Sequence, residues 1–311
     1  MEELKVFTGN AHPALGKAIC DYLGVPLGKS EVFQFSNENT FVRILENVRS
    51  RDTFVVQPFA SPVNQNIMEM LIMIDALKRA SAERITAIIP YYAYGRTDKK
   101  DQPRVPITAR LIADLLTVAG ANSVLTIDLH ATQIQGFFNI PVDELTALYL
   151  LSNSFKGFDH ELVVVATDIG ISKRARDLAD RLHAPLAIME KRRMGNNDTT
   201  ETLNVIGEVA GKIVLTVDDE IDTAGSLVKT VQTLLDRGVK EVYSCCTHAV
   251  FSGSAIQRIA NSPVKQVVVT DTLPMDAKKK INKVKVLPVA PLLGEAIRRI
   301  HTGESVGAMF E

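Results

Sequence analysis

Three aspartates and a run of small residues stand together in the second half of the 311-residue chain. Residues 212–226 read K-I-V-L-T-V-D-D-E-I-D-T-A-G-S, and apolar residues then recur at helical spacing. A strand, a small-residue loop and a helix N-terminus in this order bind phosphate, because backbone N–H groups and the positive end of the helix dipole point at the anion. Two carboxylates beside such a loop suit hydroxyl groups or a magnesium ion. The sequence therefore predicts a site for a sugar phosphate.

The same stretch resembles the 5-phosphoribosyl-diphosphate binding loop of type I phosphoribosyltransferases and their relatives. That loop has apolar residues, two acids, two intervening residues and then D-T-(G/A)-G-(T/S). Glu220 takes a middle position that is usually apolar. The alternative is an ordinary acidic turn between a strand and a helix, and the number of acids, hydroxyls and glycines in register disfavours it.

Length and composition limit the class of protein. A chain of 311 residues suggests about two domains, and a hydrophobic content of 46% is ample for full cores. The net charge of -1 gives no electrostatic footprint for nucleic acid or an anionic membrane. Three cysteines form no disulfide framework, the acidic start M-E-E-L-K lacks a signal-peptide core, and no apolar run reaches the ~18 residues of a membrane span. We therefore expect a cytoplasmic protein without nucleic-acid or membrane partners.

Short apolar strands alternate with helices along both halves of the chain. We expect strands at residues 4–8, 41–45, 53–57, 85–89, 124–127, 162–166, 186–189, 203–206, 213–217, 239–245 and 264–270. Helices are expected at residues 14–23, from about 64, from about 107, at 171–182 and after 226. This alternation predicts an α/β protein with parallel sheets. The strands V-L-T-I-D-L-H and V-L-T-V-D-D-E both end on acids, which suggests a duplicated domain with its boundary between residues 141 and 152.

Residues 91–106, Y-Y-A-Y-G-R-T-D-K-K-D-Q-P-R-V-P, differ from their surroundings. They are polar and charged, they end in two prolines, and they join a core strand to a helix. About sixteen residues is longer than the usual strand–helix connection, and long loops of this kind are often functional. The cations Arg96, Lys99, Lys100 and Arg104 favour a lid over a plain surface loop.

Four further motifs extend the resemblance to the whole chain. They are P-Y-Y-A-Y-G-R-T-D-K-K at 90–100, D-L-H-A-T-Q-I-Q-G-F-F at 128–138, T-D-I-G at 167–170 and K-R-R at 191–193. With them, the chain resembles the phosphate-activated class of ribose-phosphate diphosphokinases from residue 4 to residue 310.

This resemblance implies two type I phosphoribosyltransferase-like domains, each with a mainly parallel sheet flanked by helices. The expected domains are 1–145 and 146–293, and the tail 294–311 is expected to pack back on the first. The implied reaction moves the diphosphoryl group of ATP to the 1-hydroxyl of ribose 5-phosphate. The products are 5-phosphoribosyl 1-diphosphate, used for nucleotide biosynthesis, and AMP. Family members need Mg²⁺ and typically form hexamers built from dimers.

The resemblance also assigns site residues. Ribose 5-phosphate is expected to contact Asp218, Asp219, Asp222, Thr223, Ala224, Gly225 and Ser226. The expected magnesium contacts are His130 and Asp168, with Asp128 as a supporting acid. The position of His130 at the carboxyl end of a strand, where open α/β sheets bind ligands, favours this role over a structural one.

Lys191 and Arg193 match the catalytic lysine and arginine of the family. Diphosphoryl transfer depends on neutralising charge on the transferred group, so cations beside that group are expected. Alternate spacing on a strand would place both side chains on one face, with Arg192 opposite. Without the resemblance, a solvated basic turn is an equally good interpretation.

The positions that match the family's ATP site are Phe35, Asn37, Asn39, Arg96, Thr97, Asp98 and His130. Two of them depart from the family pattern. Asn39 stands where glutamate is usual, and Thr97 stands where glutamine is common, so the adenosine contacts of this chain are expected to differ.

Inorganic phosphate activates and ADP inhibits members of the family at a subunit interface. The matching positions here are Arg49, Ser81, Arg104, Gly307, Ala308 and Phe310. Two arginines suit a phosphate anion. Gly307 stands where serine is common, which removes one hydroxyl donor.

Two other functions compete with synthesis. A phosphoribosyltransferase uses the same loop but needs only one such domain, and it leaves D-L-H and residues 35–39 unexplained. A non-catalytic regulatory homologue usually carries insertions or lacks catalytic residues, and neither feature occurs in this sequence.

Overall fold

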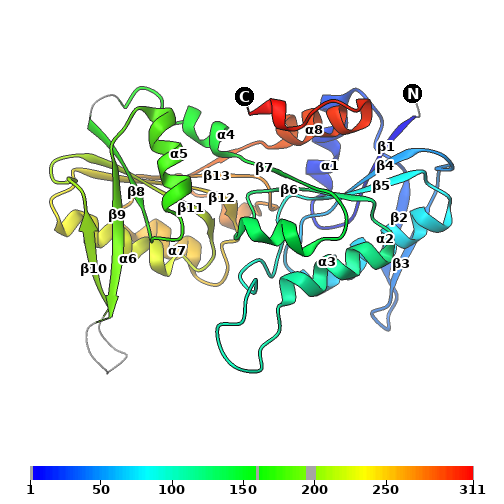
Figure 1. The fold of residues 1–311 in the computed structure, drawn as a ribbon, viewed down its shortest axis with the longest axis horizontal. Helices are drawn as coiled ribbons and strands as arrows, with labels where there is room; N and C mark the ends of the chain where they lie inside the picture. Colours follow the sequence, from blue (N-terminus) through cyan, green and yellow to red (C-terminus); the bar gives the residue numbers. More distant parts are fainter. Residues whose placement is uncertain (1–2, 159–160, 194–200, 311) are drawn as a thin grey trace. The chain divides into compact units, whose positions relative to one another are not determined.

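The computed structural model describes residues 3–158, 161–193 and 201–310, without the side chains of 191–193 and 201–203. The chain divides into two compact units (Figure 1). Unit 1 comprises residues 1–146, 272–274 and 288–311, and unit 2 comprises residues 147–271 and 275–287. Among the described helices, none combines the length and apolarity that crossing a membrane requires.

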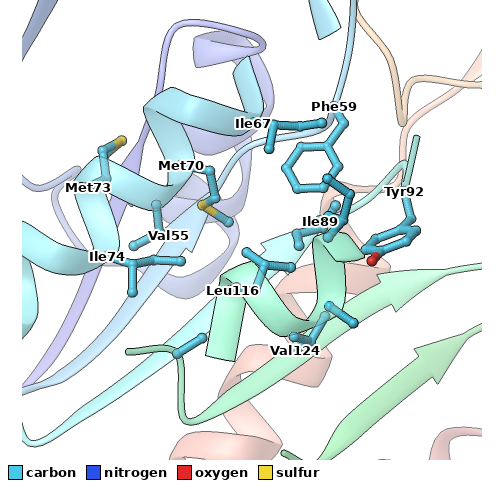
Figure 2. Close-up of a cluster of buried hydrophobic side chains, with 14 of the residues drawn as sticks. Val55, Phe59, Ile67, Met70, Met73, Ile74, Ile89, Tyr92, Leu116 and Val124 are labelled. Atoms are coloured by element: carbon cyan, nitrogen blue, oxygen red, sulfur yellow. The ribbon is translucent and has the colours of Figure 1, made fainter. Parts of the chain in front are cut away.

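Unit 1 contains a five-stranded sheet in which every pairing is parallel. The order is β1-β4-β5-β6-β7, with bounds Leu4–Thr8, Asp52–Val56, Arg84–Ile89, Ser123–Ile127 and Val142–Leu145. Its helices are α1 (Pro13–Leu23), α2 (Val63–Arg79), α3 (Thr108–Ala119) and α8 (Ala290–Thr302), with short 3-10 turns at η1 (Thr132–Phe137) and η4 (Gly307–Met309). Side chains of α2 and α3 form one core with the sheet (Figure 2). Helix α8 lies beside α1 (Figure 1), and a Cβ atom built on Gly294 would clash with the ring of Tyr22 there.

A two-stranded antiparallel hairpin, β2 (Ser30–Gln34) and β3 (Thr40–Ile44), also belongs to unit 1. The sequence predicted a strand at residues 41–45, close to β3, and no element at the residues of β2. Val32 is the one apolar residue of β2 that packs against the core. A single such residue does not produce the alternation of apolar and polar residues that marks a strand. Pairing with β3 forms the strand.

Unit 2 contains a seven-stranded sheet in the order β10-β9-β8-β11-β12-β13-β14. The bounds, in chain order from β8 to β14, are Leu162–Ala166, Leu186–Arg193, Glu201–Ile206, Ile213–Ile221, Glu241–Ala249, Gln266–Thr270 and Val284–Leu287. Its helices are α4 (Leu148–Asn153), α5 (Ser172–Leu182), α6 (Gly225–Asp236) and α7 (Ala255–Asn261), with a 3-10 turn at η3 (Ala277–Lys279). All pairings are parallel except that of β10 with β9. The predicted α/β class with mainly parallel sheets is confirmed.

Strand β11 is longer than the sequence predicted. The apolar run indicated an end at Val217, whereas the strand continues through the acids to Ile221. The extra residues pair with β12, whose partners run from Cys246 to Ala249. Backbone pairing is indifferent to side-chain polarity, so a strand continues as long as its neighbour supplies hydrogen bonds. For the same reason β9 continues past the expected end at residue 189, because it pairs with β10 up to Arg193.

Candidate active site

The sheet of unit 2 reverses its order between β8 and β11. β9 lies on one side of β8, and β12 lies on the far side of β11. In open α/β sheets, ligands bind beyond the carboxyl ends of the strands at such a switch point. The pairing of β8 with β11 ends at Ala166 and Val217. The residues that follow, 167–168 and 218–219, therefore emerge at the same edge of the sheet.

Asp218 and Asp219 are held close together at this edge. Asp218 accepts hydrogen bonds from the hydroxyl of Thr167 at 3.3 Å and from the backbone N–H of Asp219 at 3.0 Å. Burial, together with the side chain of Asp219, raises the pKa of Asp218 from its ordinary 3.8 to about 8, and the charge of Asp168 adds to the increase. Such crowded carboxyl groups gain from hydroxyl donors or a cation, which matches the sugar or metal chemistry expected from the sequence.

Asp168 begins the loop after β8 and is exposed. One of its carboxylate oxygens accepts from the N–H of Ile171 at 3.1 Å, just before helix α5. Among the described residues, no group of three His, Cys, Asp or Glu side chains forms a ready-made metal site. Magnesium commonly retains water and substrate phosphates as ligands, so a single exposed carboxylate beside other acids fits a magnesium contact.

The phosphate loop, residues 222–226, joins β11 to α6. Ala224 has a φ of 59°, a left-handed conformation that favours glycine and is strained for a residue with a Cβ atom such as alanine. Helix α6 begins at Gly225, and no side chain in the described part of the chain caps it. Thr223, Gly225 and Ser226 are exposed. The first N–H groups of α6 have no partners within the helix, so they are available to an anion.

A second segment braces this loop from the side. Ser252, which follows β12, donates its N–H to the carbonyl of Asp222 at 3.1 Å and its hydroxyl to the carboxylate of the same residue. Arg258 on α7 donates from Nη1 to the carbonyl of Thr223 at 2.9 Å. No local pattern in the sequence points to either residue, because Ser252 lies 30 positions after Asp222 and Arg258 lies 35 positions after Thr223.

Lys191 and Arg193 lie on β9, the neighbour of β8 in the sheet. β9 pairs with β8 only as far as Ile188, so both positions extend beyond the carboxyl end of β8. Their backbones pair with Leu203 and Glu201 of β10. The side chains of Lys191 and Arg193 lie outside the described part of the structure. Because β9 continues beyond the end of β8, the backbones of residues 191 and 193 lie at the edge of the sheet that carries Asp168.

His130 lies in unit 1, in the loop after β6, and is exposed. The chain turns at Asp128, which is buried and has a φ of 43°. Glu144 on β7 accepts from the N–H of Leu129 at 2.8 Å and from the side-chain amide of Gln135. Glu144 therefore positions the D-L-H turn. No sequence motif marks Glu144, because a single glutamate on a short strand forms no pattern.

The segment 91–97 packs against this turn. A Cβ built on Gly95 would lie 3.1 Å from the Cβ of His130, so the two backbones approach closely. Tyr92 is buried near Phe59 and Ile89 (Figure 2), and its hydroxyl donates to the carbonyl of Ala109 at 2.9 Å. The prediction of a lid is therefore wrong for the start of the segment. Residues 99–104 are all exposed and remain the candidate lid.

Besides His130, the expected ATP contacts fall at two places in unit 1. Arg96 is exposed, and Asp98 is half-buried. The hydroxyl of Thr97 donates to the carbonyl of Tyr94 at 2.7 Å, so this threonine closes a turn in which Tyr94 has a φ of 64°. Thr97, which stands where glutamine is common in the family, therefore also stabilises the local turn.

The other three expected ATP contacts occupy the tip of the β2–β3 hairpin. The ring of Phe35 is 49% exposed and lies 5.2 Å from Phe33 and 5.7 Å from Phe41, measured between centroids. The side chain of Asn37 accepts from the N–H of Asn39 at 3.2 Å, which closes the tip. An exposed ring on a turn fixed in this way is a suitable platform for a flat base.

Two of the expected regulatory positions, Arg49 and Ser81, lie in segments that are hydrogen-bonded to each other. The N–H of Ser50, next to Arg49, donates to the carbonyl of Ser81 at 2.9 Å, and Ser81 has a φ of 63°. Arg104 is exposed in the candidate lid. Gly307 and Ala308 lie in η4, and the N–H of Phe310 closes that turn on the carbonyl of Gly307 at 3.1 Å.

The structure thus defines an α/β protein whose second sheet carries, at its switch point, paired acids followed by a small-residue loop and a helix N-terminus. Comparison with known proteins is consistent with this class. Residues 4–120 match the model for the N-terminal domain of ribose phosphate pyrophosphokinase, and residues 194–311 match the phosphoribosyl synthetase-associated domain.

Full-length relatives carry the same name. The chain is 54% identical over 309 residues to the ribose-phosphate pyrophosphokinase of Caldanaerobacter subterraneus subsp. tengcongensis, covering 99% of this chain and 98% of the relative. It is 48% identical over 310 residues to that of Bacillus subtilis, with coverages of 99% and 98%. The crystal structure of phosphoribosylpyrophosphate synthetase from Mycobacterium smegmatis superposes with a TM-score of 0.93 at 43% identity, covering 97% of this chain and 100% of that one. The chain belongs to the ribose-phosphate pyrophosphokinase family of enzymes, as the resemblance implied.

Proposed function

We propose that this chain transfers the diphosphoryl group of ATP to the 1-hydroxyl of D-ribose 5-phosphate, giving 5-phosphoribosyl 1-diphosphate and AMP for nucleotide biosynthesis. One observation carries this proposal: the phosphate loop directly follows the paired acids at the switch point, in a chain of this family. A sugar phosphate offers an anion for the loop and hydroxyl groups for the acids. No single nucleobase or inorganic anion offers both.

On the sugar side, residues 222–226 bind the 5-phosphate through the first N–H groups of α6 and through nearby hydroxyls. Asp218 and Asp219 accept hydrogen bonds from the ribose hydroxyls. Their crowding supports this role, because a hydroxyl donor lowers the cost of carrying two charges at one strand end.

Lys191 and Arg193 are the catalytic residues in this proposal. Charge develops on the oxygens of the transferred group, and a fixed cation stabilises that charge more in the transition state than in the ground state. The strand β9 supports the role, because a strand holds positions 191 and 193 more rigidly than a loop does.

ATP is bound by residues of the hairpin tip and of the loops after β5 and β6. These are Phe35, Asn37, Asn39, Arg96, Thr97, Asp98 and His130. Mg²⁺ is the cofactor, with His130 and Asp168 as its protein contacts. When bound, it neutralises charge on the phosphate oxygens. The exposure of both side chains, each at the carboxyl end of a strand, supports this role.

We further propose the domains 1–145 and 146–293, with the tail 294–311 on the first, a cytoplasmic location, and a homohexamer built from dimers. Phosphate as activator and ADP as inhibitor act at Arg49, Ser81, Arg104, Gly307, Ala308 and Phe310. Three buried cysteines without disulfides support a reducing compartment.

The test is to incubate the purified protein with ATP, ribose 5-phosphate and Mg²⁺ and to measure AMP and 5-phosphoribosyl 1-diphosphate. The two products should form in equal amounts. A phosphoribosyltransferase would instead release diphosphate from 5-phosphoribosyl 1-diphosphate only when a base is added. A non-catalytic homologue would bind ATP and form no AMP, and either result would overturn the proposal.

A further inference from the structure

The guanidinium of Arg258 lies against the phosphate loop, and the proposed function gives it no role. Its Nη1 donates to the carbonyl of Thr223 at 2.9 Å. A Cβ built at Gly225 would stand 3.7 Å from the same nitrogen. The guanidinium therefore reaches from the middle of the loop to the first residue of α6, where the 5-phosphate is proposed to bind.

The segment before α7 fixes the position of the Arg258 backbone relative to the loop. The N–H of Phe251 donates to the carbonyl of Ile221 at 3.0 Å, and Ser252 makes two hydrogen bonds to Asp222. Both contacts tie the start of the segment to the end of β11 and to the loop. Although the side chain of Arg258 is exposed, it leaves the backbone only six positions after Ser252. Its approach to the loop is thus set by backbone contacts.

The loop lacks a positively charged side chain of its own to balance a bound phosphate, and Arg258 supplies one. Residues 222–226 contain no lysine or arginine but do contain Asp222, and Asp218 and Asp219 stand beside them. A phosphate monoester carries a charge of about −1.5 to −2 at neutral pH, whereas a helix N-terminus is equivalent to only about +0.5. Arg258 supplies a full positive charge. A guanidinium has five N–H donors, and the bond to Thr223 uses only one of them.

We propose that Arg258 is a binding residue for the 5-phosphate of the sugar, acting by its charge and by its remaining N–H donors. This proposal rests on the proposed function and adds a residue to its sugar site. The bond to Thr223 orients the guanidinium, and the outer N–H groups face the anion. Arg258 thereby favours a phosphorylated sugar over a neutral one.

The experiment compares Arg258→Ala, Arg258→Lys and Arg258→Gln with the wild type. AMP release is measured while ribose 5-phosphate is varied at saturating ATP, and then while ATP is varied, at one fixed phosphate concentration. Arg258→Ala should raise the KM for ribose 5-phosphate by about tenfold to a hundredfold, which is the usual effect of losing a charge-assisted hydrogen bond. The KM for ATP should stay within about twofold. Arg258→Lys should recover most of the loss, and Arg258→Gln should not.

Arg237→Ala is the matched control. Arg237 is exposed in the same unit but at the opposite end of α6, so its substitution removes the same charge at a site far from the loop. It should leave both KM values within about twofold. The KM of the wild type for ribose 5-phosphate should also rise with salt more steeply than that of Arg258→Gln, because salt screens a charge and spares a neutral bond.

Two results overturn the proposal: an unchanged KM for ribose 5-phosphate in Arg258→Ala, or a glutamine that restores binding as well as lysine does. The second result would mean that Arg258 only supports the Thr223 carbonyl. If the alanine variant does not fold, the lysine and glutamine variants decide the question. Calorimetric titration of ribose 5-phosphate without ATP repeats the comparison independently of catalysis. A wild type that binds the sugar phosphate but releases no AMP contradicts the proposed function and leaves Arg258 separately testable.

Discussion

Replacing Asp218 with Asn should stabilise the protein without ligand while weakening its hold on ribose 5-phosphate. The new asparagine can keep the existing bonds, because its Oδ1 accepts from the N–H of Asp219 and its amide donates to the hydroxyl of Thr167. What the variant loses is a charge that burial and the neighbouring acids make costly. The expected result is a higher melting temperature and a higher KM for the sugar phosphate.

The magnitude follows from the pKa of Asp218. An increase from 3.8 to about 8 corresponds to at most about 6 kcal/mol, at 1.36 kcal/mol for each pKa unit. Asp218 is only half-buried, and the edge of β11 beyond Val217 is not paired with β8, so water screens the charge. We therefore expect about 1–2 kcal/mol, or about 1.5–3 °C in the melting temperature of a chain of this length.

The pH dependence of stability tests whether the charge of Asp218 destabilises the folded protein. The folded protein holds the proton of Asp218 more tightly than the unfolded chain does, so this group favours folding at low pH, and that contribution is lost as the pH rises through the raised pKa. The advantage of Asp218→Asn should therefore grow between pH 5 and pH 9 and level off above that.

Thermal melts of both proteins in matched buffers test this prediction. Asp177→Asn, on the exposed face of α5, removes one charge from a site open to water and serves as the control. A gain in melting temperature that is equal at pH 5 and pH 9, or a loss at pH 9, would refute the argument. So would a KM for ATP that rises as much as the KM for ribose 5-phosphate, since that would assign the acid to metal binding.

Three further outcomes are expected. Lys191→Ala should lower kcat by about 10²–10³-fold with little change in the KM for ribose 5-phosphate, and a near-normal kcat with a raised KM would contradict the catalytic role. Trypsin should cut after Lys99 or Lys100 rapidly in the free protein and slowly with ATP and Mg²⁺, and equal rates in both conditions would remove the lid. Gly307→Ser has room, since a Cβ there meets only the hydroxyl of the nearby serine at 3.6 Å. It should move half-activation to lower phosphate, whereas Arg49→Ala should abolish most of the response, and an enzyme indifferent to phosphate would show that the regulatory site is wrongly assigned.

Local patterns in the sequence are enough to predict the fold class and to locate the loop and acids proposed to bind the sugar phosphate. The apolar run before Asp218 and the helical spacing after Ser226 mark a strand and a helix, and the small residues between them mark the turn. These signals are local, because a strand's burial and a helix's periodicity are written in adjacent residues. The motifs at 128–138 and 167–170 likewise place His130 and Asp168 at strand ends without any tertiary information.

The parts of the site that the sequence did not predict depend on pairings between distant segments. β11 runs on to Ile221 because β12 continues beside it, and β2 forms because β3 returns along it. Glu144 reaches the D-L-H turn because β7 is the neighbour of β6. In each case the deciding contact comes from a neighbouring strand, and a local pattern contains no information about which strand that will be.

The phosphate loop shows both sources together. Its residue types follow from the need for small side chains where backbone N–H groups meet an anion, and the sequence alone states that need. Arg258 stands 35 positions from Thr223 and belongs to another helix. It comes to the loop only because β11 and β12 are adjacent and the chain turns back after β12. The sequence determined the chemistry of this loop, and the packing of the sheet decided which cation stands beside it, because proximity between distant residues arises only when the strands pair.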